Sequence, residues 1–183
     1  MENGGVVGRG VLLDYVRWRE ETGQEPAKAT ISHPITTDEL DAVAKHQGVT
    51  FKTGDILIIR TGFTLWHDRA SQEERVEVMN RGEFIGVEAS MQSVKWIWNH
   101  HFAAVAGDSV GWECCPAHFG EKGKIVLHEW LIDHWGSPLG ELWNLESLAA
   151  FCAEQKRWTF FFTSAPLHVF GGVASPPNAL AIL

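Results

Sequence analysis

The sequence has little of several features that would assign it to a class of protein. Its 183 residues include three cysteines, two of them adjacent, which is too few for a disulfide framework. No long apolar run could span a membrane, and the first ten residues lack the pattern of a secretory signal. A net charge of −8, with no basic cluster, argues against nonspecific nucleic-acid binding. We therefore expect a reduced, cytoplasmic protein that binds neither membrane nor nucleic acid.

What the chain does contain is typical of a folded domain. Hydrophobic residues make up 45% and charged residues 21% of the sequence, which predicts a single domain over residues 1–183. Nine tryptophans stand against one tyrosine. Such aromatic side chains fill cores more often than they line pockets or interfaces, so we expect most of them in the core.

The order of apolar runs and turn signals predicts alternating strands and helices. Thr36 and Glu39 have the spacing of a capping box that starts a helix, and Ile56-Leu57-Ile58-Ile59 is typical of a strand buried on both faces. Strands are predicted at residues 6–16, 56–59, 102–106, 158–163 and 179–183. Helices are predicted at 36–46, 89–99 and 144–156, with a charged helix or lid within 66–82 and helical character near 126–134. This alternation indicates an α/β domain.

The stretch from Ala104 to Leu145 holds the candidate functional residues. His128 and Glu141 lie thirteen residues apart, and an imidazole with a carboxylate can bind zinc or manganese. The alternative is a buried histidine hydrogen-bonded to a carboxylate. Asp108 ends an apolar run, so it either faces a substrate pocket or caps the next turn. His118 and His168 are further pocket candidates in loops. The zinc-protease pattern H-E-x-x-H fails because position 132 is Ile.

Several segments together resemble the family of cyclases and kynurenine-formamidase-like metal-dependent hydrolases. They are Thr37-Asp38-Glu39-Leu40, Gly54 to Gly62 (GDILIIRTG), Ala106-Gly107-Asp108-Ser109, Leu127-His128 with Glu141 to Leu145 (ELWNL), and Pro166-Leu167 through Gly171-Gly172 to Ser175-Pro176. Gly8 to Asp14 (GRGVLLD) is most similar to the fungal branch. The similarity runs in order along nearly the whole chain.

The resemblance implies a fold, a reaction class and site residues. The fold would be a swivelling β/β/α domain assembled as a homodimer or tetramer. The activity would be hydrolysis of a small amide, formamide or cyclic carbonyl substrate by water activated on one or two Zn²⁺ or Mn²⁺ ions, without an organic cofactor. By the motif match His128 and Glu141 would bind the second metal, although their spacing is one residue longer than usual.

The main departure from the family is a missing motif. The family's principal metal segment, H-x-G-T-H-x-D, lies upstream of the strand that matches Gly8 to Asp14, and no such sequence occurs here. We therefore expect an N-terminally truncated domain with an incomplete metal site that binds metal weakly or not at all. The missing strands would leave a sheet edge and an apolar surface uncovered, which predicts a homo-oligomer.

Three functional interpretations follow from the sequence. The first is an active metal-dependent hydrolase whose site is completed across a dimer or by residues outside this sequence. The second is a non-catalytic binding or interaction protein on the same scaffold. The third is an inactive fragment. The fold alone does not decide among them, and no residue specifies the substrate.

Overall fold

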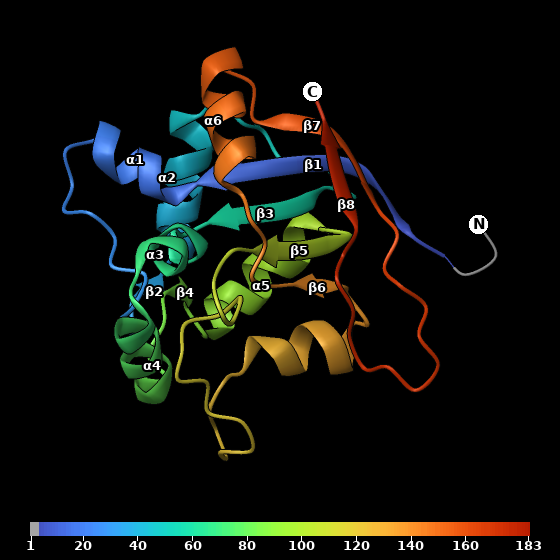
Figure 1. Ribbon diagram of the computed structural model, residues 1–183. Coiled ribbons are helices and arrows are strands. Elements are labelled where there is room, and N and C mark those ends of the chain that lie inside the picture. The colour runs from blue at the N-terminus through green and yellow to red at the C-terminus, as the bar shows by residue number, and fades with distance from the viewer. Residues whose placement is uncertain (1–3) are drawn as a thin grey trace.

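A six-stranded sheet forms the centre of the computed structural model, which describes residues 4–183 (Figure 1). The strand order is β6-β5-β3-β1-β7-β8. The strands are β1 (Val6–Asp14), β3 (Ile56–Arg60), β5 (Ala104–Gly107), β6 (Leu139–Gly140), β7 (Thr159–Ser164) and β8 (Ala179–Ile182). The first four of these run parallel, β7 pairs antiparallel with β1, and β8 pairs antiparallel with β7. The carboxyl ends of the four parallel strands therefore meet at one edge of the sheet.

Helices cover both faces of this sheet. They are α1 (Tyr15–Glu21), α2 (Thr37–His46), α3 (Phe63–Arg69), α4 (Gln72–Arg81), α5 (Met91–His100) and α6 (Glu146–Gln155), with a short π-helix at Glu129–His134. A separate parallel pair joins β2 (Pro34–Ile35) to β4 (Gly86–Val87). This mixed α/β arrangement confirms the predicted fold class.

The core divides into two clusters because consecutive strand residues point to opposite faces. The larger cluster joins Leu13 and Leu57 to side chains of α2 and α5, such as Leu40 and Ile97. The smaller cluster packs α6 and Phe162 against the other face. The unbroken apolar run of β3 serves both clusters, which is why its four apolar residues, Ile56 to Ile59, are all buried.

The strongest local signals are confirmed. Thr36 Oγ1 accepts a hydrogen bond from the backbone N–H of Glu39, whose carboxylate accepts one from the Thr36 N–H, so the predicted capping box starts α2. The helix ends at His46, and Gly48 follows in a left-handed conformation.

Some predicted boundaries are wrong, and polar side chains explain them. The first strand ends at Asp14 rather than residue 16, because the Asp14 carboxylate caps α1 by accepting a hydrogen bond from the Arg17 N–H. The charged segment forms two helices, since Ser71 and Glu74 make a second capping box that starts α4. The last helix begins at Glu146, and Asn144 accepts a hydrogen bond from its N–H without being the N-cap residue.

The tryptophans divide between the core and its margins. Trp18 and Trp112 are buried, Trp98 is exposed, and the other six are partly buried. Among the described residues, no helix combines the length and apolar character needed to cross a bilayer.

Candidate functional site: a His–Glu pair beside an apolar cavity

Polar residues gather at the edge where the parallel strands end. Asp14 ends β1, Arg60 ends β3, Asp108 follows β5 and Glu141 follows β6. Ligand sites of open α/β sheets commonly form at this edge. The strand topology therefore brings together side chains that are far apart in the sequence.

Asp108 is fully buried and holds the start of α3. One carboxylate oxygen accepts hydrogen bonds from the Thr61 N–H at 2.6 Å and the Thr61 hydroxyl at 2.8 Å, and the other accepts from the Gly62 N–H at 2.7 Å. Burial raises the pKa of Asp108, and these hydrogen bonds oppose the rise. Gly62 is the left-handed N-cap residue of α3 and has no side chain to cap it. Asp108 thus orders a loop of the edge. Two cavities, of about 640 and 310 Å³, adjoin Glu141, and Asp108 lines neither of them.

Arg60 forms a second buried network at this edge. Its guanidinium donates to Asp14 at 2.8 Å and makes two further hydrogen bonds of 2.8 Å to the Glu146 carboxylate. Burial opposes the charged form, but the hydrogen bonds to Glu146 and the nearby Asp14 outweigh it and raise the pKa of Arg60. The pair with Glu146 ties the end of β3 to α6.

The two predicted metal ligands, His128 and Glu141, lie side by side. His128 immediately precedes the π-helix and Glu141 follows β6, and the distance from His128 Nε2 to Glu141 Oε1 is 2.9 Å. The same Glu141 oxygen accepts a hydrogen bond from the Trp112 N–H at 3.0 Å. The pairing itself fits both sequence interpretations, the metal ligand pair and the hydrogen-bonded histidine.

Glu113, which sequence reasoning missed, lies directly behind this pair. Its side chain is completely buried and reaches the other ring nitrogen, with 2.6 Å between Glu113 Oε1 and His128 Nδ1. It also accepts hydrogen bonds from the backbone N–H groups of Leu127 and His128. The sequence contains one signal for it: Glu113 is the single carboxylate in an otherwise uncharged stretch from Ser109 to Gly120. A carboxylate that is buried with such a stretch needs a hydrogen-bonding partner.

The two carboxylates favour the charged form of the histidine. Hydrogen bonding to Glu113, then to Glu141, raises the pKa of His128 to about 9, while partial burial opposes the rise. At neutral pH His128 is therefore an imidazolium that bridges two carboxylates. A metal ion at Nε2 would have to displace that proton.

The residues around His128 fit part of a metal coordination shell. His128 Nε2 and the Glu141 carboxylate are suitable ligands, and a carboxylate hydrogen-bonded to the second ring nitrogen is the usual support of a metal-binding histidine. Within residues 4–183, however, no group of three or more His, Cys, Asp or Glu side chains is placed to hold one ion. The site offers two ligands where a catalytic zinc commonly has three.

The other predicted pocket histidines lie apart from this pair. His118 is exposed and pairs with Glu121 at 2.9 Å, although its neighbour Phe119 makes an edge contact with the His128 ring. His168 lies in the exposed segment between β7 and β8. The structure brings neither imidazole to Glu141.

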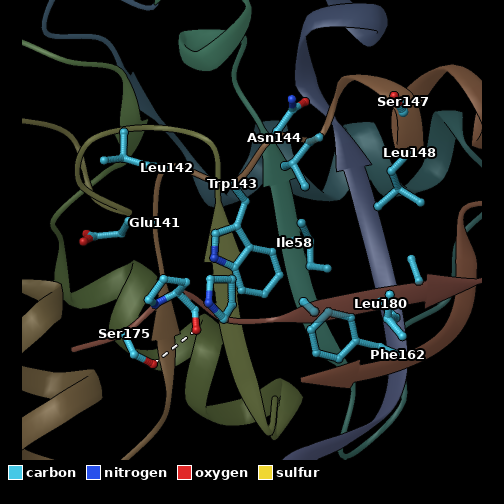
Figure 2. Close-up of a pocket in the computed structure, with 15 residues that line it drawn as sticks. Ile58, Glu141, Leu142, Trp143, Asn144, Ser147, Leu148, Phe162, Ser175 and Leu180 are labelled. Atoms are coloured by element: carbon cyan, nitrogen blue, oxygen red, sulfur yellow. Dashed lines mark hydrogen bonds between the residues drawn. The ribbon is translucent and has the colours of Figure 1, made fainter. Parts of the chain in front are cut away.

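A cavity of about 640 Å³ opens beside Glu141, and Figure 2 shows the side chains that line it. The Trp143 indole and the Phe162 ring are parallel, with centroids 5.7 Å apart. Pro176 and Pro177 come from the segment that leads into β8, and Glu141 lies at the margin of the group (Figure 2). An adjoining cavity of about 310 Å³ shares Glu141 and Trp143. A cavity with an aromatic wall, polar residues such as Asn144 and Ser175 in its lining, and Glu141 at its margin suits a small planar molecule.

Comparison with known proteins finds one family model and several solved structures that are similar to this chain. The family model described as "Putative cyclase" matches residues 1–114. A crystal structure of a novel cyclase is 32% identical, with a TM-score of 0.80 over 97% of this chain and 54% of that one. Isatin hydrolase A from Ralstonia solanacearum is 18% identical, with a TM-score of 0.62 over 95% of this chain and 59% of that one.

A potential metal-dependent hydrolase with cyclase activity is also similar, at 17% identity and a TM-score of 0.54. It covers 95% of this chain, which covers 64% of it. The chain thus spans between about half and two thirds of the length of these structures. The comparison with curated proteins gives no match.

Proposed function

The chain belongs to the putative cyclase family, and from that premise we propose that it acts in the hydrolysis of a small amide, formamide or cyclic carbonyl compound. In this proposal His128 and Glu141 supply two ligands for a Zn²⁺ or Mn²⁺ ion, and the adjoining cavity holds the substrate. The observation that carries the proposal is the 2.9 Å contact between His128 Nε2 and Glu141 Oε1, because Glu141 also lines that cavity.

The chain's own residues would bind and orient the substrate. The parallel Trp143 and Phe162 rings form an apolar wall on which a planar ring can stack, and Pro176 and Pro177 line the same cavity. Glu141 would hold a divalent ion at the rim, so that the reactive carbonyl lies next to it. Such an ion, when bound, lowers the pKa of a water molecule and polarises a carbonyl oxygen.

Two ligands do not complete a catalytic site, so further ligands would come from water, a second copy of the chain or residues outside this sequence. The absence of an H-x-G-T-H-x-D motif from the sequence supports this part of the proposal. The same proposal includes two finer assignments. The chain is a kynurenine-formamidase-like protein, and the likeness of its GRGVLLD segment assigns it to the fungal branch.

The second candidate function is non-catalytic binding of a small aromatic molecule. It is favoured by the imidazolium form of His128, which fills the space between the two carboxylates without a metal. In that case the cavity would be retained for recognition while hydrolysis is lost.

Assays of the purified chain with added Zn²⁺ or Mn²⁺ distinguish these candidates. Suitable substrates are an N-formyl aromatic amine, a cyclic imide and isatin, the last because two similar folds are named isatin hydrolase A. Metal-dependent hydrolysis that disappears in Glu141→Gln and persists in the matched surface variant Glu121→Gln would support the hydrolase. Quenching of tryptophan fluorescence by these compounds without turnover would support the binding protein.

A further inference from the structure

We propose that Glu113 is the positioning residue of this site: it fixes the His128 ring so that Nε2 points to Glu141 and both can bind one divalent cation. This inference rests on the proposed function and deepens it, since neither the family resemblance nor the sequence pattern assigned a role to Glu113. Its basis is a set of short contacts among buried groups.

The Glu113 carboxylate is saturated by groups of the His128 segment alone. Oε2 accepts a hydrogen bond from the Leu127 N–H at 2.7 Å. Oε1 accepts one from the His128 N–H at 3.0 Å and contacts His128 Nδ1 at 2.6 Å. Because a carboxylate has no proton to donate, Nδ1 must carry the proton in this contact. Glu113 therefore fixes both the backbone and the ring orientation of His128.

The adjacent residue fixes the second ligand. The Trp112 N–H donates to Glu141 Oε1, the same oxygen that faces His128 Nε2. One dipeptide, Trp112-Glu113, thus holds both proposed ligands through neighbouring groups. An ion pair that only stabilised the fold would not need to be linked to Glu141. A glutamate at the surface could neutralise His128 without any contact to Glu141.

The dipeptide is itself anchored on β4. The Val87 N–H donates to the Trp112 carbonyl at 3.0 Å, and the Cys114 N–H donates to the Val87 carbonyl at 2.9 Å. A Cβ added to Gly86 would lie only 2.3 Å from the carbonyl carbon of Glu113, so the two backbones are in direct contact. Glu113 is therefore held in place by backbone hydrogen bonds on both sides of it, as the support of a precise site must be.

The test compares Zn²⁺ affinity and the His128 ring signals in three proteins. Glu113→Gln keeps the shape of the side chain. Its amide NH₂ cannot accept a hydrogen bond, however, so it would face one of the N–H groups that now donate to the carboxylate. Asp55→Asn is the matched control, because Asp55 is also buried and accepts three hydrogen bonds, from Arg9 and Lys52, away from His128. Calorimetric titration with Zn²⁺ alone gives the affinity. Side-chain ¹⁵N–¹H spectra of the metal-free proteins, assigned with His128→Ala, report the Nδ1 proton.

Glu113→Gln should bind Zn²⁺ about 10- to 100-fold more weakly, as is typical of a lost supporting carboxylate. Its Nδ1–H signal should be less protected, because a neutral amide oxygen accepts a weaker hydrogen bond than a carboxylate. Asp55→Asn should keep both properties. An unchanged Nδ1–H signal, a Zn²⁺ affinity within about twofold of the parent, or equal losses in both variants would overturn the proposal. If Glu113→Gln does not fold, Glu113→Asp replaces it, since it keeps the charge and withdraws the carboxylate, and the same criteria apply.

Failure of the proposed function would look different. In that case the parent chain and His128→Ala would have the same Zn²⁺ affinity, which overturns metal binding at this pair. The ring signals would still decide whether Glu113 orients His128, because they are measured without metal.

Discussion

The carboxyl edge of the sheet and the C-terminal hairpin of β7 and β8 differ in the kind of side chain that they bury. At the edge, Asp14, Asp108 and Glu113 are buried and paired with donors. In the hairpin and the segment before β8, large apolar side chains are exposed, including Phe161, Phe170, Val173 and Leu180. Buried polar groups and exposed apolar groups are both costly. The carboxyl edge therefore holds the candidate site, and the C-terminal hairpin exposes an apolar surface.

Breaking the buried network should have the largest effect on stability. Arg60→Met would leave Asp14 buried without its main partner, and we expect a loss of about 3 to 5 kcal/mol in the free energy of unfolding. Urea denaturation measures it. Arg81→Met removes an exposed pair with Glu77 and should cost less than about 1 kcal/mol. Similar losses in both variants would contradict the contrast between the two kinds of ion pair.

The stability of the metal-free protein should fall as the pH rises through the titration of His128. The folded pKa of about 9 lies above the unfolded value near 6.5, so the folded state binds the proton more tightly. The contribution is full below about pH 6.5 and is lost by about pH 9, and it amounts to at most about 3 kcal/mol. The unfolding free energy of the parent, minus that of His128→Ala, should show this decline. A difference independent of pH would contradict the two carboxylate contacts.

The support of the site can be disturbed without changing a polar side chain. Gly86→Ala would push its Cβ against the Glu113 backbone, and we expect a loss of about 1 to 3 kcal/mol from overpacking. Gly8→Ala is the control, since its Cβ would lie 3.3 Å from the flexible end of Ile56 and 3.6 Å from the Gly54 carbonyl oxygen, and neither contact is a severe clash. Thermal denaturation of both variants gives the comparison. Equal midpoints would mean that β4 does not constrain Glu113.

A change in the exposed segment should have the smallest effect on folding. Phe170 has no contact that shields its ring, so Phe170→Ser should change the unfolding free energy by less than about 0.5 kcal/mol. The sequence also predicts an oligomer, and a second copy could cover this apolar surface. Sedimentation velocity of the parent and of Phe170→Ser would then differ. A monomeric parent would remove the oligomer prediction.

Local signals in the sequence were sufficient for elements that carry their own stop and start residues. The capping box at Thr36 and the apolar run of β3 are examples, because their causes lie within a few residues. The two-residue strands β2, β4 and β6 could not be predicted, since each exists only through its pairing partner.

The residues of the candidate site also differ in how far the sequence could predict their roles. The family resemblance pointed to His128 and Glu141, and the structure places them in contact. Glu113 could not be linked to its partners from the sequence, because Leu127 and His128 are fourteen and fifteen residues away. Asp108 could be placed at a strand end but not assigned to Thr61 and Gly62, which belong to the neighbouring strand's loop.

Metal content is the measurement that tests the central claim most directly. The parent chain and His128→Ala would be dialysed to equilibrium against a fixed concentration of Zn²⁺ or Mn²⁺ and subjected to elemental analysis, with the dialysis buffer as the blank. We expect more bound metal in the parent than in the variant. No metal above the blank in the parent, or equal metal in both proteins, would contradict a metal site at His128 and Glu141.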